Sequence, residues 1–281
     1  MNSFLVPGLA LIAGVLAEAL ILRYLLDMLE NTGAVRPNYL GLNIPVSVGI
    51  SFPAAVMFVY MLAALLSRYR PSYDLFMLGL MTISFLGFID DMLGQRDTLG
   101  FKGHIGALLR GRLTTGGLKA GGGFALALFL AFFHSPTITD LVINCLVIGL
   151  FTNLINLLDL RPGRAAKGFL FFLLVIIGLA AGKVEWMLVA PLLGAVLYYF
   201  RFDVGARTMM GDAGSNVLGL SLGYFTVLFL PFWCRAGFLL FLIGMHIYTE
   251  KYSLSNTIEK ISWLRAIDQW GRPKSAAHSN D

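Results

Sequence analysis

The sequence predicts an all-α polytopic membrane protein with about nine transmembrane helices, and three observations support this fold class. The 281 residues are 57% hydrophobic and only 13% charged, whereas a soluble domain carries about 25% charged residues. The apolar residues gather into runs close to the roughly 20 residues that a helix needs to cross a bilayer. These runs lack the polar–apolar alternation of a membrane β-barrel. A water-soluble fold, a disordered chain and a disulfide scaffold are therefore excluded.

Nine apolar runs are the candidate spans. The first is interpreted as a retained span, because Met1-Asn2-Ser3 lacks the basic region of a signal peptide. Three later runs are short, so each requires snorkelling ends or a re-entrant path. In chain order the nine runs are residues 4–29, 45–66, 74–89, 118–134, 137–158, 168–182, 186–200, 213–233 and 236–249.

The distribution of positive charge predicts the orientation. Most Lys and Arg residues lie in the long polar connections, and few lie in the short ones. The positive-inside rule then places the long connections in the cytoplasm, the N-terminus outside and the C-terminal tail inside. Residues 1–249 form the multi-span domain, and residues 250–281 form a tail with apolar side chains at helical spacing. That tail either lies on the inner leaflet or packs on the loops.

Acidic residues are predicted to reach one membrane face. Asp90 and Asp91 end the third run, Asp159 ends the fifth, and Asp212 opens the eighth. Two spans separate each consecutive pair, so these carboxylates meet the same face whichever way the protein is oriented. Adjacent carboxylates at a helix C-terminus are unfavourable unless a divalent cation or basic neighbours balance them. The sequence thus indicates a site, although a hydrated helix end is the alternative for Asp90 and Asp91.

Two further motifs accompany these acids. Asn153, Asn156 and Asp159 recur every three residues along one stripe of a helix, which suits either a polar site or hydrogen bonds between packed spans. Asp212 is either the N-cap of the next span or a metal ligand. Gly214 and Ser215 follow it and are candidates for a phosphate cradle.

Basic residues supply the opposite charge. The loop 94–119 is basic, and its Lys102 and His104 lie in a glycine-containing stretch that can cradle an anion. A cytoplasmic loop would be basic in any case. Glu18 lies inside the first span, where an acid is either functional or paired with Arg23. A Gly219-x-x-x-Gly223 motif predicts a close helix-packing face.

In this order, Asp90-Asp91, Asn153…Asn156…Asp159 and Gly211-Asp212-x-Gly214-Ser215 resemble the polyprenyl-phosphate N-acetylhexosamine-1-phosphate transferases of glycosyltransferase family 4. The resemblance extends from about Arg36 to about Gly223. It implies transfer of a sugar 1-phosphate from a UDP-sugar to undecaprenyl phosphate, with release of UMP. It also implies a multi-pass protein of the bacterial cytoplasmic membrane that serves cell wall biogenesis.

The resemblance assigns roles to matching residues. Asp212 would be the Mg²⁺ ligand, with Mn²⁺ as an alternative metal. Asp90, Asp91 and Asp159 would be the catalytic acids. Undecaprenyl phosphate is largely dianionic at neutral pH, so a single in-line displacement is favoured over a covalent aspartyl-phosphate. The nucleotide- and phosphate-binding set would be Asn153, Asn156, Lys102, His104, Arg161, Arg164, Gly214 and Ser215.

The chain also departs from the family pattern. Leu160-Arg161-Pro162-Gly163-Arg164 stands where Asp-Gly repeats usually follow, Gly94 replaces an expected lysine, and the His-rich loop and tenth span are not found. Two alternatives therefore stay open. One is a silent homologue that binds a lipid phosphate or a partner enzyme, and the other is an ion-coupled transporter. The expected partners are undecaprenyl phosphate, a UDP-sugar and the bilayer, without nucleic acid; a homodimer is left open.

Overall fold

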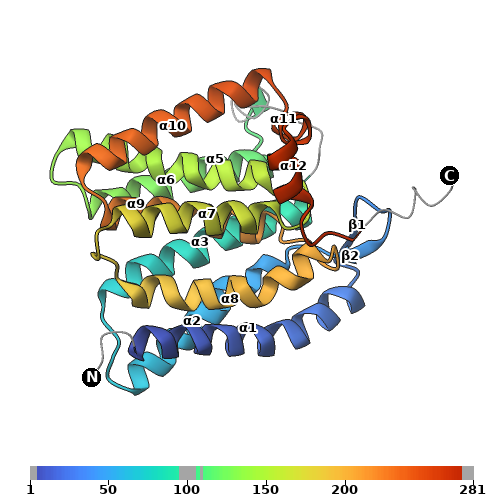
Figure 1. The fold of residues 1–281 in the computed structure, drawn as a ribbon, viewed down its shortest axis with the longest axis horizontal. Coiled ribbons are helices and arrows are strands. Elements are labelled where there is room, and N and C mark those ends of the chain that lie inside the picture. Colours follow the sequence, from blue (N-terminus) through green and yellow to red (C-terminus); the bar gives the residue numbers. More distant parts are fainter. Residues whose placement is uncertain (1–4, 95–105, 108–109, 274–281) are drawn as a thin grey trace.

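The computed structural model describes residues 5–94, 106–107 and 110–273, which form a bundle of long helices lying side by side (Figure 1). Within these residues, nine long helices follow the nine apolar runs one for one. They are α1 (Leu5–Asn31), α2 (Ser51–Leu65), α3 (Ser72–Leu93), α5 (Thr115–Phe132), α6 (Ile138–Leu158), α7 (Arg164–Leu179), α8 (Trp186–Val204), α9 (Asp212–Phe229) and α10 (Phe232–Lys251).

The all-α, multi-span class is confirmed. In the described part of the chain, seven of the nine helices are long and apolar enough to cross a membrane. The other two are α7, with 16 residues, and α9, whose residues are buried along nearly the whole helix. Because α9 faces other helices and not lipid, it can carry Asp212, Ser215 and Asn216 in its first turns. The side of the membrane on which each end lies stays a prediction.

Glycine allows the central helices to approach closely, as the Gly219-x-x-x-Gly223 motif predicts. A Cβ at Gly219 would lie 2.5 Å from the carbonyl oxygen of Phe151, and one at Gly223 would lie 2.5 Å from the Cα of Ile148. These two glycines therefore place α9 directly against the backbone of α6. The contact sets the position of the first turn of α9 relative to the carboxyl end of α6.

The buried acid Glu18 of α1 is held by α2. Its carboxylate is fully buried and accepts a hydrogen bond from the Ser51 hydroxyl at 2.6 Å. Glu18 thus points into the bundle. In the described part of the chain its partner is Ser51, and no ion pair with Arg23 is formed.

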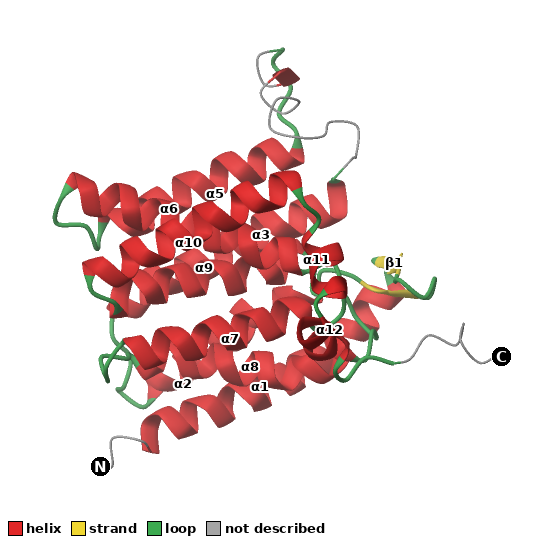
Figure 2. Ribbon diagram, turned by 45° about the horizontal axis from the view of Figure 1, so that its top comes forward, coloured by secondary structure: helices red, strands yellow, loops and turns green. Residues whose placement is uncertain are grey.

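Short elements gather at one end of the bundle (Figures 1 and 2). The strands β1 (Val35–Pro37) and β2 (Asn43–Pro45) pair antiparallel, with Arg36 opposite Ile44. They lead to the 3₁₀ helix η1 (Val48–Ile50). The amides of Val48 and Gly49 donate to the carbonyls of Met209 and Met210 at 3.1 and 3.0 Å. This pairing holds the segment before α9 against the α1–α2 connection.

The C-terminal segment lies at the same end (Figure 2). After α10 the chain forms α11 (Leu254–Lys260) and α12 (Ser262–Gln269). The division into a membrane domain at 1–249 and a tail at 250–281 stays a prediction, and α10 itself continues to Lys251. The side chains of Arg164 and Lys167 on α7 contact α12, and the sequence assigned the first of these two residues to phosphate binding.

Candidate active site

A cavity of about 1810 Å³ opens at this end of the bundle, and three acidic residues from two helices line it. Asp90 and Asp91 come from the last turn of α3, and Asp212 is the first residue of α9. Asp212 is far from Asp90 and Asp91 in the chain, but the packing of α9 against α3 brings it beside them. Of the four acids predicted to reach one membrane face, those at 90, 91 and 212 thus share this cavity, and the side of the membrane on which it lies stays a prediction.

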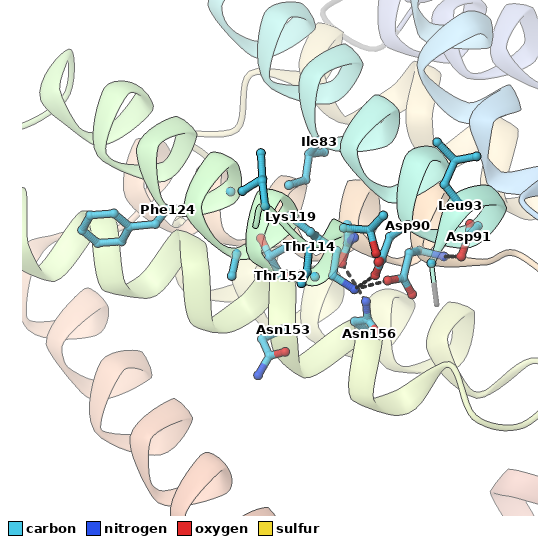
Figure 3. A pocket seen from close by; sticks show the side chains of 18 of the residues that line it. Ile83, Asp90, Asp91, Leu93, Thr114, Lys119, Phe124, Thr152, Asn153 and Asn156 are labelled. Atoms are coloured by element: carbon cyan, nitrogen blue, oxygen red, sulfur yellow. Dashed lines mark hydrogen bonds and ion pairs between the residues drawn. The ribbon is translucent and has the colours of Figure 1, made fainter. Parts of the chain in front are cut away.

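Asp90 and Asp212 contact the same cation, the ammonium of Lys119 on α5. The Lys119 Nζ atom lies 2.6 Å from Asp90 Oδ2 and also contacts Asp212 Oδ2. All three side chains are partly buried, and all three line the cavity. Lys119 thus joins the ends of α3 and α9 across the cavity wall (Figure 3). In the sequence Lys119 is one of several basic residues of the loop 94–119, and nothing there distinguishes it as the partner of Asp90 and Asp212.

Asp91 has different partners from its neighbour. The amides of Asp212 and Ala213 donate to its two carboxylate oxygens at 3.0 and 3.2 Å, and the Ser47 hydroxyl donates to it as well. Asp91 is therefore the cap of α9, because it satisfies amides that the first helical turn leaves without a partner. Gly211 has a φ of 70°, and a Cβ there would collide with the Asp91 carboxylate. Glycine at 211 is thus required both for the turn and for the space.

Asp159 follows α6 and lies beside the same turn. The Gly211 amide donates to its carboxylate, while the side chains of Asp203, Asp212 and Asp91 place negative charge nearby. Burial of the carboxylate and these charges raise the pKa of Asp159 well above the usual carboxylate range. Asp159 and Asp91 therefore both contact the backbone of the turn that presents Asp212, and Asp159 is outside the cavity lining.

The two asparagines of the predicted stripe line the cavity, and Asn156 lies beside the acids (Figure 3). Asn153 is exposed. The Asn156 amide donates to Asn216 Oδ1 at 2.9 Å, so this residue also ties α6 to α9. Both interpretations of the stripe are thus represented: Asn156 bridges helices, and Asn153 faces the cavity.

Gly214 and Ser215 are placed in the helix packing and not on the cavity wall. Gly214 crosses Gly49 so closely that a Cβ on it would lie 2.6 Å from the Gly49 Cα. Ser215 is fully buried, and its hydroxyl makes no hydrogen bond within the described residues. Their contacts explain why these small residues follow Asp212, because α9 must begin against η1.

The basic turn before α7 binds the C-terminal segment. The buried Arg164 guanidinium donates to both Asp268 oxygens, at 2.8 and 3.0 Å, and to the Ser255 hydroxyl at 2.8 Å. Arg272 also pairs with Asp268, and its Nε donates to the Pro162 carbonyl at 2.8 Å. We call the side chains of Arg164, Lys167, Asp268 and Arg272 the tail clamp. Neither Arg161 nor Arg164 is among the residues that line the cavity.

Lys167 completes the tail clamp at the carboxyl end of α12. Its ammonium donates to the carbonyls of Ile267, Asp268 and Trp270 at 2.9, 3.0 and 2.7 Å. A cation is favourable there, because the last carbonyls of a helix carry partial negative charge. Arg164, which the resemblance assigns to phosphate binding, and its neighbour Lys167 therefore hold the tail in this structure.

Other basic residues reach the cavity. Arg36 of β1, Arg110 and Arg112 line it together with the acids. The sequence marked Arg36 only as the start of the family resemblance, and it left Arg110 and Arg112 among the general charges of a cytoplasmic loop. Lys102 and His104, which it did select, lie outside the described residues.

A divalent metal fits one part of this arrangement. Among the residues that the structure describes, no group of three or more His, Cys, Asp or Glu side chains is arranged to hold a metal ion. Asp90 and Asp212 nevertheless contact one cation, the Lys119 ammonium. Mg²⁺ is bound through one or two carboxylates, with waters and substrate phosphates as its other ligands. Two convergent carboxylates beside an open cavity are sufficient for such a site.

Fold and site together define a helical membrane protein with an acid-lined cavity at one end of its bundle. Residues 74–230, more than half of the chain, match the family model for glycosyl transferase family 4. The chain belongs to this family, as the resemblance predicted.

One curated relative can be aligned over much of the chain. It is the phospho-N-acetylmuramoyl-pentapeptide-transferase of Clostridioides difficile (strain 630), which is 29% identical over 202 residues. The match covers 62% of this chain and spans 58% of the relative's length.

Proposed function

We propose that this protein transfers a sugar 1-phosphate from a UDP-sugar to undecaprenyl phosphate, forming a polyprenyl diphosphate sugar and UMP. The reaction would take place at the cytoplasmic face of a bacterial inner membrane. The observation that carries this proposal is that one cavity, lined by described residues, holds both acidic and basic side chains at one end and an apolar wall beyond them. Family membership is consistent with this activity.

The apolar wall suits a lipid acceptor. Beyond Lys119 the cavity is lined by Ile83, Phe124, Ile148 and Leu220 of α3, α5, α6 and α9. Contact of an isoprenoid chain with such a wall is favourable wherever the chain displaces water, because apolar surface is then buried. The lipid phosphate would then lie where the apolar lining meets Asp90 and Lys119.

The basic residues suit the diphosphate of the donor. Arg36, Arg110 and Arg112 line the cavity near the acids, and arginine binds phosphate oxygens through paired N–H donors. A donor held there by its phosphates would place its β-phosphorus toward the acceptor. The exposed Asn153 is available to the nucleotide from the α6 side.

The four acids would have two different roles. Asp212 and Asp90 would hold Mg²⁺. The metal would neutralise the negative charge that develops as the acceptor phosphate bonds to the donor and UMP leaves. Asp90 would also orient the acceptor phosphate, an oxygen of which bonds to the β-phosphorus as the bond to UMP breaks. Asp91 and Asp159 would keep the Gly211–Ala213 turn in place, so that Asp212 faces the cavity.

The test is transfer by the purified protein. Wild type and Asp212→Asn would be incubated with undecaprenyl phosphate, Mg²⁺ and a panel of UDP-sugars, and UMP would be measured. We expect UMP from at least one donor, and about a thousandfold less with Asp212→Asn. Undiminished release from the variant would remove Asp212 from the metal site, and no release with any donor would contradict the transferase.

A second candidate is a homologue that binds a lipid phosphate without transfer. The observation in its favour is that Lys119 already neutralises Asp90 and Asp212 in this structure. In that case undecaprenyl phosphate would raise the melting temperature of the protein without any release of UMP. The same incubations, followed by a thermal unfolding scan, distinguish the two functions.

A further inference from the structure

Lys119 occupies the one position in the described cavity that two carboxylates share. Its ammonium contacts Asp90 Oδ2 at 2.6 Å and Asp212 Oδ2, and its side chain is 27% exposed toward the cavity. A single cation between two carboxylates on different helices is the arrangement expected of a metal site. Here the protein supplies that cation from a third helix.

The ammonium and a divalent metal cannot share this position. Both would bind the same carboxylate oxygens, and their like charges would repel at contact distance. Binding of a metal therefore requires Lys119 to leave. The cavity has room for the displaced side chain, because its volume is about 1810 Å³ and Gly116 and Gly123, about one turn to either side of Lys119 on α5, also line it.

We propose that Lys119 is a built-in counter-cation, which neutralises Asp90 and Asp212 in the metal-free site and is released into the cavity when the divalent metal binds. This inference rests on the proposed function only for the identity of the metal site. The released ammonium faces the cavity in which the substrate phosphates would bind, so metal binding would prepare the site for an anion. The exchange also keeps the metal-free protein from burying two unbalanced carboxylates.

The first test measures Mn²⁺ binding to purified protein in detergent, without any substrate, by the electron paramagnetic resonance signal of free Mn²⁺. Lys119→Met removes the charge while keeping a side chain of similar length. We expect the variant to bind Mn²⁺ about tenfold more tightly than wild type, because no internal cation competes. Arg112→Gln is the matched control, because Arg112 lines the cavity and, within the described residues, contacts neither acid; its removal should change the affinity by less than about threefold.

The second test follows Lys119 directly in the wild-type protein. Acetylation of lysines by a water-soluble ester, read by mass spectrometry, should be slow at Lys119 without metal and several-fold faster with saturating Mn²⁺. Labelling that is unchanged by Mn²⁺, or a Lys119→Met variant that binds Mn²⁺ no more tightly, would overturn the exchange while leaving the proposed function intact. Absence of Mn²⁺ binding in wild type and both variants would count against the metal site itself, and so against both proposals.

Discussion

Two clusters of charge lie at the same end of the bundle, and they differ in what their side chains contact. In the tail clamp, Arg164 and Asp268 are buried and make their hydrogen bonds to other parts of the protein. In the cavity, Asp90, Lys119 and Asp212 are partly exposed and line a space of about 1810 Å³. Charge alone therefore does not identify a binding site in this protein.

The difference has a physical origin. A buried ion pair is favourable only when its remaining hydrogen-bonding atoms are also satisfied, and then it has no capacity left for a ligand. The cavity cluster keeps part of its surface for solvent, so a metal or a phosphate can replace what is there now. The tail clamp should therefore respond to mutation through stability, and the cavity cluster through binding.

The largest effect is expected from Arg164→Met. Removing one partner of a buried ion pair costs about 3–5 kcal/mol, because the other charge stays buried. The amides of α12 should then exchange with deuterium at least about a hundredfold faster than in wild type, whereas Mn²⁺ affinity should be unchanged. A variant that keeps α12 protected but raises the KM for the UDP-sugar would instead place Arg164 at the substrate, as the family resemblance implies.

Asp91→Asn tests the division between neighbouring acids. The amide cannot accept all the hydrogen bonds that the carboxylate receives from Ser47, Asp212 and Ala213, so the first turn of α9 should lose its position. Residues that orient a metal ligand typically contribute 10–100-fold to affinity, and we expect a loss in this range for Mn²⁺.

The matched comparison for that variant is Asp90→Asn. Asp90 pairs with the Lys119 ammonium and does not cap α9. The Asp90→Asn variant should therefore lower Mn²⁺ affinity without lowering the melting temperature. Equal loss of stability in the two variants would contradict the distinction between a capping acid and a cavity acid.

Low pH should weaken the tail clamp. Burial raises the pKa of Asp268, but hydrogen bonds from Arg164 and Arg272 outweigh it and hold the pKa below the usual value of 3.8. A carboxylate with a lowered pKa stabilises the folded state above its unfolded pKa, and this stabilisation is lost as the pH falls through the folded value. Protection of the α12 amides should therefore be complete above about pH 5 and fall below about pH 4 in wild type. In Asp268→Asn the protection should already be low at pH 7, and a variant as protected as wild type there would contradict this role.

The smallest effect is expected from Asn153→Ala. Its exposed side chain lines the cavity, so its removal should change the unfolding free energy by less than about 0.5 kcal/mol. A hydrogen bond to the nucleotide would contribute about 1 kcal/mol, which corresponds to a several-fold rise in the KM for the UDP-sugar. Unchanged KM values across the donor panel would remove Asn153 from the nucleotide site.

Much of the fold could be predicted because hydropathy reflects the bilayer directly. Each apolar run became one helix, and counting spans between Asp90, Asp159 and Asp212 correctly placed these residues at one end. The glycine motif at 219 and 223 also predicted a close packing face. Span length, charge position and glycine spacing are local properties, so they can be read without knowing which helices are neighbours.

The site was less predictable, as Gly214, Ser215 and Arg164 illustrate. Gly214 and Ser215 resemble a phosphate cradle in the sequence, but their contacts are with η1 and the helix interior. Arg164 resembles a phosphate ligand, but it pairs with Asp268, which lies 104 residues away. A partner so distant in the chain leaves no local signal.

By itself, the sequence determined the class of protein, the number of long helices and the end of the bundle at which the acids gather. Only the tertiary structure decided that Asp90 faces Lys119 and Asp212 while Asp91 caps α9. Successive residues of a helix point in directions about 100° apart, so two adjacent aspartates necessarily face different surroundings. Which surroundings each one meets depends on how α5 and α9 pack around the end of α3, and that packing is a property of the whole bundle.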